Sequence, residues 1–202
     1  MMNFLRSAMI VVAIGLGGCV GTGRQEEPGR YDFGLPAGAG GAAGLNVGAV
    51  EVQARSWLAG SEMQYRLGYA DPARRYNYAD SRWAAAPAEL LEGFLAQQVV
   101  FRQPHAKGAG CRLRIGLEDL TQEFDDARVS RVNLEASAVL MAPRGDGPLS
   151  KRAFHIRAAA PTPDARGGVQ ATRQAVQALA ADINAWLAEL ASSRSQDLNG
   201  CL

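Results

Sequence analysis

The stretch 131–140, RVNLEASAVL, decides the fold because it is the most regular strand pattern in the chain. Its apolar residues occupy every second position, and they are Val132, Leu134, Ala136, Ala138 and Leu140. The residues between them include Arg131, Asn133, Glu135 and Ser137. Successive strand side chains point to opposite faces of a sheet, so the pattern predicts a strand with one buried and one solvated face.

Two further strands are expected to flank this one. The segment 144–147, RGDG, has the composition of a hairpin loop, and the apolar alternation resumes from Arg152 to Ala158. On the N-terminal side, the apolar residues 113, 115 and 117 fall on odd-numbered positions. The positions expected to be buried further along, 120, 122 and 124, are even-numbered. A bulge near Glu118 and Asp119 would restore the buried face.

Three more strands are predicted in the first half of the chain. Residues 45–54 form an almost continuous apolar run, which is typical of a buried strand. In residues 63–69, large apolar or aromatic side chains alternate with smaller or polar residues. Residues 76–83 repeat this alternation after a turn at Asp71 and Pro72, so the last two strands are expected to form a hairpin.

One helix is expected after each set of three strands. Pro87 suits a first helical turn, and apolar residues follow at helical spacing up to Val99. Residues 169–191 carry one apolar stripe, which either covers the sheet, the interpretation that we prefer, or faces a partner. The predicted fold class is α+β, a mostly antiparallel sheet of about six strands in βββα-βββα order with both helices on one face.

The N-terminus resembles a bacterial lipoprotein signal peptide. Arg6 supplies a positive charge, residues 8–16 are apolar but too short to span a membrane, and residues 16–19, LGGC, resemble a lipobox. Cleavage would free Cys19 for lipidation; the alternative is an ordinary secretory signal in which Cys19 is incidental.

These features divide the chain into three parts. Residues 1–18 are the predicted signal peptide, and residues 19–44 are the lipidated cysteine and a glycine-rich tether, in which residues 31–35 could dock on the folded body. Residues 45–202 are the predicted single periplasmic domain.

Charge and cysteine usage restrict the function further. The formal net charge is +1, and no basic patch indicates nucleic-acid binding. Cys111 and Cys201 would lie in an oxidising compartment, where two remaining cysteines are more often paired than free. In the alternative, Cys201 frays with the tail and Cys111 is a buried strand residue.

Residue types suited to catalysis are sparse. His105 and His155 are the only histidines, and no His or Cys spacing matches a metal site. His155 occupies a polar position of its strand, so we expect it to be solvated. We therefore predict no enzyme activity, no catalytic residue, no metal site and no cofactor.

Short motifs in residues 51–91 follow one another in the order found in a known family. They are the segments 57–58 (WL), 65–67 (YRL) and 82–84 (RWA), and the proline at 87. This order resembles the auxiliary lipoproteins of ABC-type transport systems, the family of paraquat-inducible protein C. The resemblance covers most of residues 31–190 and departs at Arg55, where it leads us to expect proline.

The resemblance implies a partner role in the bacterial envelope. It implies a lipid-anchored protein, typically in the outer membrane, that works with an inner-membrane ABC permease and ATPase and their MCE-domain protein in lipid transport. A structural or outer-membrane assembly lipoprotein and a periplasmic hydrolase are the alternatives, and a homo-oligomer is left open.

Aromatic residues identify a candidate partner-binding segment. Residues 57–83 hold two of the three tryptophans and four of the five tyrosines, residue types that are enriched at binding hot spots. The candidate residues are Trp57, Leu58, Tyr65 and Trp83. Residues 56–61 form a predicted loop, so we expect Trp57 or Leu58 to be partly exposed; the alternative is that these side chains fill the core.

The lipobox hypothesis predicts that Cys19→Ser abolishes lipidation and signal cleavage, because serine offers no thiol. Val20 follows the cysteine, and the aspartate that commonly retains lipoproteins in the inner membrane is absent. The wild-type lipoprotein should therefore fractionate with the outer membrane. Membrane fractionation and intact-mass measurement test both statements. Normal processing and membrane association of the serine variant would contradict the hypothesis.

Overall fold

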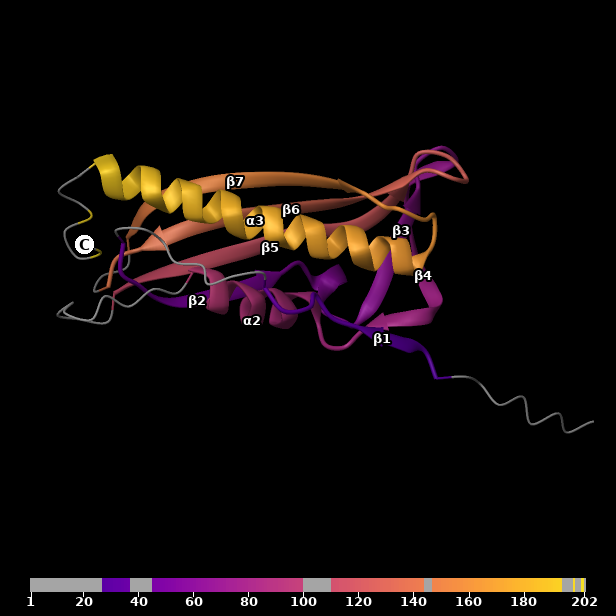
Figure 1. Cartoon of the computed structure of the whole chain (residues 1–202), viewed down its shortest axis with the longest axis horizontal. Helices are drawn as coiled ribbons and strands as arrows, with labels where there is room; N and C mark the ends of the chain where they lie inside the picture. Colours follow the sequence, from indigo (N-terminus) through magenta and orange to yellow (C-terminus); the bar gives the residue numbers. More distant parts are fainter. Residues whose placement is uncertain are drawn as a thin grey trace, which may run out of the picture.

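The structure, a computed structural model, describes residues 27–36, 45–99, 110–143, 147–193, 198 and 201. This part of the chain forms one seven-stranded sheet and two α-helices (Figure 1). The strands are β1 (Gly29–Tyr31), β2 (Val47–Ala54), β3 (Glu62–Leu67), β4 (Asp71–Trp83), β5 (Cys111–Phe124), β6 (Ser130–Met141) and β7 (Pro148–Ala159). The helices are α2 (Pro87–Val99) and α3 (Ala165–Ser193), and a short 3-10 helix, η1 (Ser56–Leu58), lies between β2 and β3.

Strand β5 is paired on both of its edges. Along one edge it runs antiparallel to β6, which in turn is antiparallel to β7. Along the other edge two strands follow one another, because β2 pairs with the first half of β5 and β3 with its last three residues, both parallel. The register of β5 against β6 shifts between Leu117 and Asp119, which confirms the predicted bulge.

The other end of the sheet is completed by β4 and β1. β4 is antiparallel to β3, and β1 is parallel to β4, with Tyr31 opposite Trp83. The fold is therefore α+β with a mixed sheet in which the longest pairings, β5 with β6 and β6 with β7, are antiparallel, as predicted.

The N-terminal boundary of the folded body differs from the predicted one. The predicted tether includes residues 29–31, but these residues form β1, the seventh strand of the sheet. Phe33 is buried, and its ring packs edge-on against Trp83 at 5.2 Å between centroids. The body therefore begins before residue 45. A three-residue strand is too short to show alternation, so only the aromatic residues of 31–35 indicated docking.

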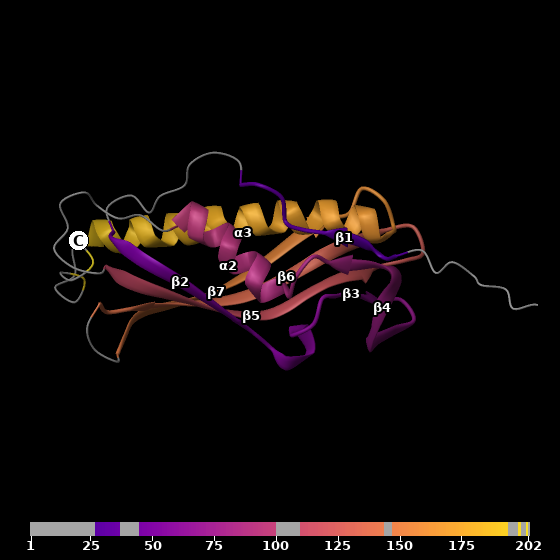
Figure 2. The ribbon, with the colours of Figure 1, turned by 90° about the horizontal axis from the view of Figure 1, so that it is seen from below.

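Both helices cover the same face of the sheet (Figure 2). The predicted stripe of α3 is buried there, with Val176, Leu179 and Ile183 fully enclosed, so it covers the sheet. Helix α2 lies along β2, and Glu92 Oε2 accepts a hydrogen bond from the Val52 N–H on the free edge of that strand at 2.8 Å. The opposite face is polar, and His155 is exposed beside Glu135, as expected.

Helix α3 begins four residues earlier than the stripe predicted. Asp164 caps it, because its Oδ1 accepts a hydrogen bond from the Gly167 N–H at 2.7 Å. The two glycines that concealed this start allow close packing. A Cβ at Gly168 would come within 2.0 Å of Gln122 Oε1, and one at Gly167 within 2.0 Å of the Thr162 carbonyl oxygen.

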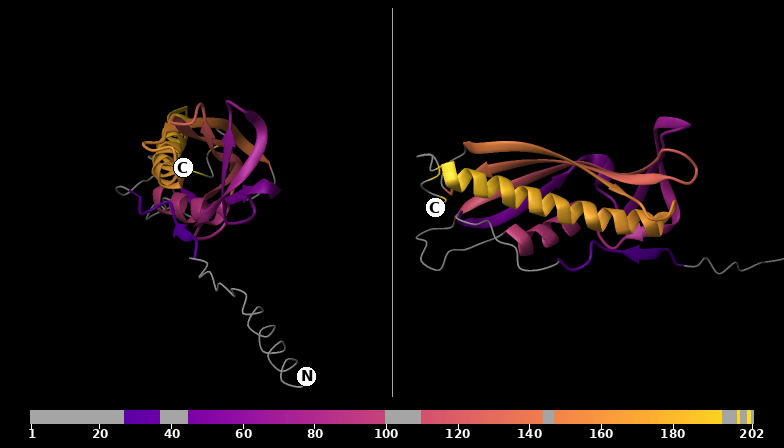
Figure 3. Two further views of the ribbon diagram at one scale, coloured as in Figure 1. Left: turned by 90° about the vertical axis from the view of Figure 1, so that its right-hand side faces the viewer. Right: turned by 45° about the horizontal axis from the view of Figure 1, so that its top comes forward.

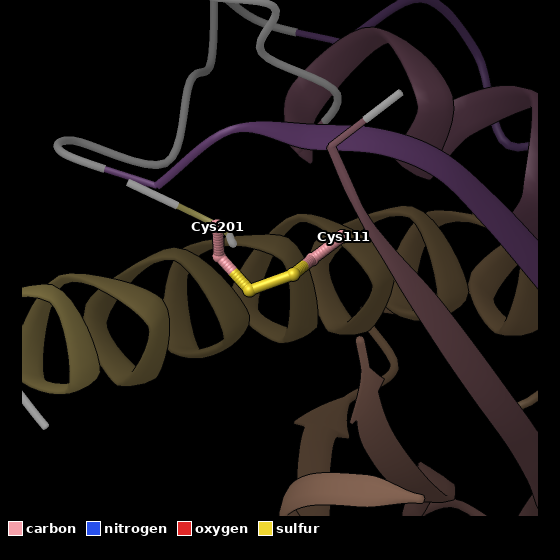
Figure 4. The surroundings of a disulfide bond; sticks show 2 residues. All are labelled: Cys111 and Cys201. Atoms are coloured by element: carbon pink, nitrogen blue, oxygen red, sulfur yellow. A yellow bond between two sulfur atoms is a disulfide. The ribbon is translucent and has the colours of Figure 1, made fainter. Parts of the chain in front are cut away.

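In the structure a disulfide joins Cys111 to Cys201 (Figure 4), with 5.2 Å between the Cα atoms. Cys111 is the first residue of β5, and both cysteines are buried. Asn46 connects the same two segments through its backbone, since its N–H donates to the Cys201 carbonyl at 2.5 Å and its carbonyl accepts from the Cys111 N–H at 2.8 Å. The bond thus fastens Cys201 to the start of the central strand.

We expect the mature protein to show no free thiol from Cys111 or Cys201 when it is unfolded without reductant. The bond spans a sequence separation of 90, and loop-closure entropy gives a stabilisation of about 4–5 kcal/mol, which is usually an overestimate. Thiol labelling with mass spectrometry checks the pairing, and denaturant unfolding with and without reductant checks its effect. Two reactive thiols in the unreduced protein would contradict it.

Candidate partner-binding site

Trp57 projects from the break between the two strands that share one edge of β5. Its side chain is 49% exposed on η1. The break faces the bulge of β5, where the Arg55 N–H donates to the Leu117 carbonyl at 3.2 Å and the Arg55 side chain pairs with Glu118 at 2.5 Å. The bulge therefore fixes the place where the chain leaves the sheet and exposes Trp57.

A partly buried hydrogen-bond network fixes Arg75, the residue beneath the indole. The Arg75 guanidinium carbon lies 5.6 Å from the centroid of the Trp57 ring, within cation–π range. Its Nη1 donates to Gln64 Oε1 at 3.0 Å, to Thr121 Oγ1 at 2.8 Å and to Asp119 Oδ1 at 3.1 Å. An arginine with this many partners has few alternative positions, so the surface under Trp57 is preorganised.

Gln64 links the network to the backbone of η1, because its Nε2 donates to the Trp57 carbonyl at 2.7 Å. Arg66 belongs to the same group, because its Nη2 lies 4.0 Å from Asp119 Oδ2. Its Nη1 donates to the Pro72 carbonyl at 2.9 Å. We call this group the Trp57 patch. Its members are Trp57, Gln64, Arg66, Arg75, Asp119 and Thr121.

The Trp57 patch is aromatic and carries a formal charge of +1. Two guanidinium groups, on Arg66 and Arg75, share the single carboxylate of Asp119, and all three side chains are about one-fifth exposed. An exposed tryptophan beside a partly desolvated arginine is typical of protein-binding hot spots. The arrangement is suited to a partner surface that has an apolar pocket and an acidic or carbonyl group next to it.

Leu58 and Trp83, two of the predicted partner-binding residues, belong instead to the core. Leu58 is 3% exposed, because η1 turns it inward as it turns Trp57 outward. Trp83 is 4% exposed beneath Phe33. Both are too deeply buried to contact a partner in this structure, so the prediction was wrong for them.

Tyr65 lies on the opposite face of β3 from Gln64, so it is separated from the Trp57 patch. Its ring stacks on Tyr76 at 5.2 Å between centroids and contacts Tyr78 at 4.7 Å and Phe124 at 5.7 Å. The residue is half-buried in this aromatic cluster. Its packing accounts for its position without a partner, and a binding role for Tyr65 stays a prediction.

Tyr78 connects the aromatic cluster to the start of α3. Its hydroxyl donates to Gln122 Oε1 at 2.9 Å, and Gln122 Nε2 donates to the Asp164 carbonyl at 3.2 Å. Burial raises the pKa of Tyr78 well above its ordinary value, with smaller contributions from Tyr65 and Asp164. The hydrogen bonds from the Gly167 N–H and the Thr162 hydroxyl lower the pKa of Asp164. Tyr78 thus stays neutral and Asp164 ionised at neutral pH, as the helix cap requires.

The sequence predicted the exposure of Trp57 but not the residues that hold it. Gln64, Arg75 and Thr121 occupy polar positions of strands, which the alternating pattern assigns to solvent. The one signal was the predicted bulge, because the shift at Leu117 and Asp119 changes which residues of β5 face the network. Arg75 contacts Asp119, which lies 44 positions away in the sequence, and Thr121, which lies 46 positions away. A local sequence pattern does not reveal contacts of this range.

Other kinds of site find little support in the described residues. Within these ranges, no group of three or more His, Cys, Asp or Glu side chains is arranged to hold a metal ion. Among the same residues, neither helix is long and apolar enough to cross a membrane. Cys19 and His105 lie outside the described residues.

Comparison with known proteins identifies the class. A family model described as "ABC-type transport auxiliary lipoprotein component" matches residues 36–184. Protein XCC0632 from Xanthomonas campestris has a similar structure, with a TM-score of 0.66 at 14% identity over 83% of this chain and 100% of that chain. A second crystal structure, of an uncharacterized protein, has a TM-score of 0.59 at 17% identity over 80% of this chain and 99% of that chain. No curated protein sequence matches.

The family match spans most of the chain and includes the segment that bears the Trp57 patch. The chain therefore belongs to the ABC-type transport auxiliary lipoprotein family, which confirms the resemblance seen in its sequence motifs. The two solved structures confirm the fold that this family model spans.

The network predicts that Asp119→Ala lowers the free energy of unfolding by about 1–2 kcal/mol, because it leaves the partly buried Arg75 without its carboxylate. Glu189→Ala is the matched control. It removes an ion pair to Arg152 whose side chains are 62% and 42% exposed, and it should cost less than about 0.5 kcal/mol. Urea unfolding of both variants checks the difference, and equal losses would contradict the network.

Proposed function

We propose that this protein is a non-catalytic subunit of an envelope lipid-transport system of the ABC and MCE type. In this proposal a lipid on Cys19 anchors it in the outer membrane, facing the periplasm, and its folded domain binds the MCE-domain protein of the system. The MCE-domain protein connects it to the inner-membrane permease and ATPase. The family membership supports the transport role, and the finer assignment is ours.

The exposed and preorganised Trp57 is the observation that carries the proposal of a partner. A large aromatic side chain left half in water on a well-packed domain loses the stabilisation that burial would give it. Here the side chain is held outward by the packing of Leu58 inward and by Gln64 on the Trp57 carbonyl. A partner that covers the indole would gain apolar burial without having to order it first.

The N-terminal sequence supports the placement in the outer membrane. The lipobox-like segment 16–19 precedes Val20, and no aspartate follows the cysteine. The folded domain adds a compatible observation, since its disulfide suits an oxidising compartment outside the inner membrane.

Trp57→Ala should weaken binding of the purified MCE partner domain by about 1–2 kcal/mol, roughly a 5- to 30-fold rise in Kd, because it removes a central aromatic contact. Binding of wild type and variant is measured by calorimetry, with circular dichroism to confirm the fold.

Leu35→Ala is the matched control. Leu35 is 83% exposed, more than Trp57, but it lies on the segment that follows β1 and outside the Trp57 patch, so the variant should bind like wild type. Wild-type affinity in Trp57→Ala would remove this surface from the proposal. Failure of the wild-type protein to bind any transporter component would refute the proposed function.

A further inference from the structure

Two neighbouring turns at one end of the sheet expose apolar side chains to water. Tyr69, in the turn between β3 and β4, is 54% exposed, and Val129, in the turn between β5 and β6, is 53% exposed. The turns are adjacent because Leu67 and Phe124, the last residues of β3 and β5, are paired. Figure 1 shows both turns together at one end of the long axis.

Hydrogen bonds within the turns keep these side chains outward. Asp126 Oδ1 accepts from the N–H groups of Arg128 at 2.6 Å and Val129 at 3.0 Å, and the Val129 carbonyl accepts from the Asp125 N–H at 2.9 Å. In the other turn the Ala70 N–H donates to the Leu67 carbonyl at 3.0 Å. Both apolar groups are thus presented by closed turns.

The N-terminal segment joins the fold at the same end of the long axis, across the sheet from the two turns, because β1 pairs with Ser81–Trp83, the end of β4 that is remote from the Tyr69 turn. Figures 1 and 3 show that β1 starts at the end of the long axis that carries the two turns, opposite the end where β2 begins. Cys19 precedes Glu27, the first described residue, by eight positions. A fully extended chain of that length reaches at most about 29 Å, so a lipid on Cys19 would lie within that distance of Glu27.

The length of the domain separates its two ends. Helix α3 has 29 residues and runs along the long axis, which corresponds to roughly 43 Å. Because the chain enters at one end and the eight positions from Cys19 to Glu27 reach less far than the helix is long, a membrane anchor on Cys19 brings the end with the turns, rather than the end with the disulfide, to the lipid.

We infer that the end of the domain marked by Tyr69 and Val129 rests on the lipid surface that holds the Cys19 anchor. The inference rests on the lipidated Cys19 of the proposed function. Tyrosine is enriched where membranes meet water, because its ring is apolar and its hydroxyl is polar, and an exposed valine beside it adds apolar area.

The charges around the turns indicate an apolar contact without electrostatic attraction. The acids are Asp71, Glu123, Asp125 and Asp126, and the bases are Arg74, Arg128 and Arg131. Arg131 pairs with Asp125, and Arg74 lies over the Tyr76 ring at 4.6 Å. Because the bases do not outnumber the acids, anionic lipid offers no net attraction, so the contact should form on zwitterionic lipid and should not weaken with salt.

This orientation leaves the Trp57 patch accessible. Strand β3 separates η1 from the turn that bears Tyr69, and its six residues span roughly 20 Å. The anchored domain would therefore hold the patch away from the headgroups, where a periplasmic partner can reach it.

The experiment uses the full lipidated chain in vesicles of phosphatidylcholine with brominated acyl chains, which quench nearby indoles. Three variants each add one tryptophan: Tyr69→Trp, Val129→Trp, and Lys151→Trp as the control near the opposite end, where β7 begins. We expect quenching of the added signal at 69 and 129 to exceed that at 151 by about twofold or more, with no loss at high salt. Circular dichroism confirms the fold of each variant.

Equal quenching at the three positions, or greater quenching at 151, would overturn the inference while leaving the transport role intact. The intact mass of each preparation is measured first. If it showed no lipid on Cys19, both the anchor of the proposed function and this inference would fall. Quenching that required anionic lipid or vanished with salt would also contradict the apolar contact.

Discussion

One extra residue in β5 is the constraint on which the rest of the structure depends. The shift between Leu117 and Asp119 keeps the strand paired with β6 over its whole length while dividing its other edge between β2 and β3. At the division the chain leaves the sheet through η1 and exposes Trp57. Beyond it Asp119 and Thr121 hold Arg75 beneath the indole. The bulge thus determines both the sheet topology and the position of the Trp57 patch.

The parts of the fold that the sequence predicts well are those in which one periodicity persists. The alternation from Val132 to Leu140 and the stripe from Val169 to Leu190 extend over many residues, so each identifies a buried face. The start of α3 was missed because Gly167 and Gly168 resemble a loop, whereas their lack of side chains is what lets the helix approach Gln122. Strand β1 was missed because three residues carry no period.

The candidate site was predictable only in part. A tryptophan in a predicted loop indicated exposure, and Trp57 is exposed. The same reasoning failed for Trp83, whose burial depends on Phe33, a residue 50 positions away in a segment assigned to the tether. Arg75 reads as a solvated strand residue, and its role appears only when Gln64, Asp119 and Thr121 converge on it. The alternating pattern of a strand indicates which of its faces is buried, whereas a hydrogen-bond network between strands becomes visible only when the strands are placed together.

The central claim is that the Trp57 patch contacts the MCE-domain protein of a transport system. Photo-crosslinking in living cells tests it most directly, with a photoreactive amino acid placed at position 57 and, as the control, at position 155, which is exposed on β7. The account predicts an adduct with the MCE-domain protein from position 57 and none from position 155. Adducts with outer-membrane assembly proteins alone, or no adduct from position 57, would contradict it.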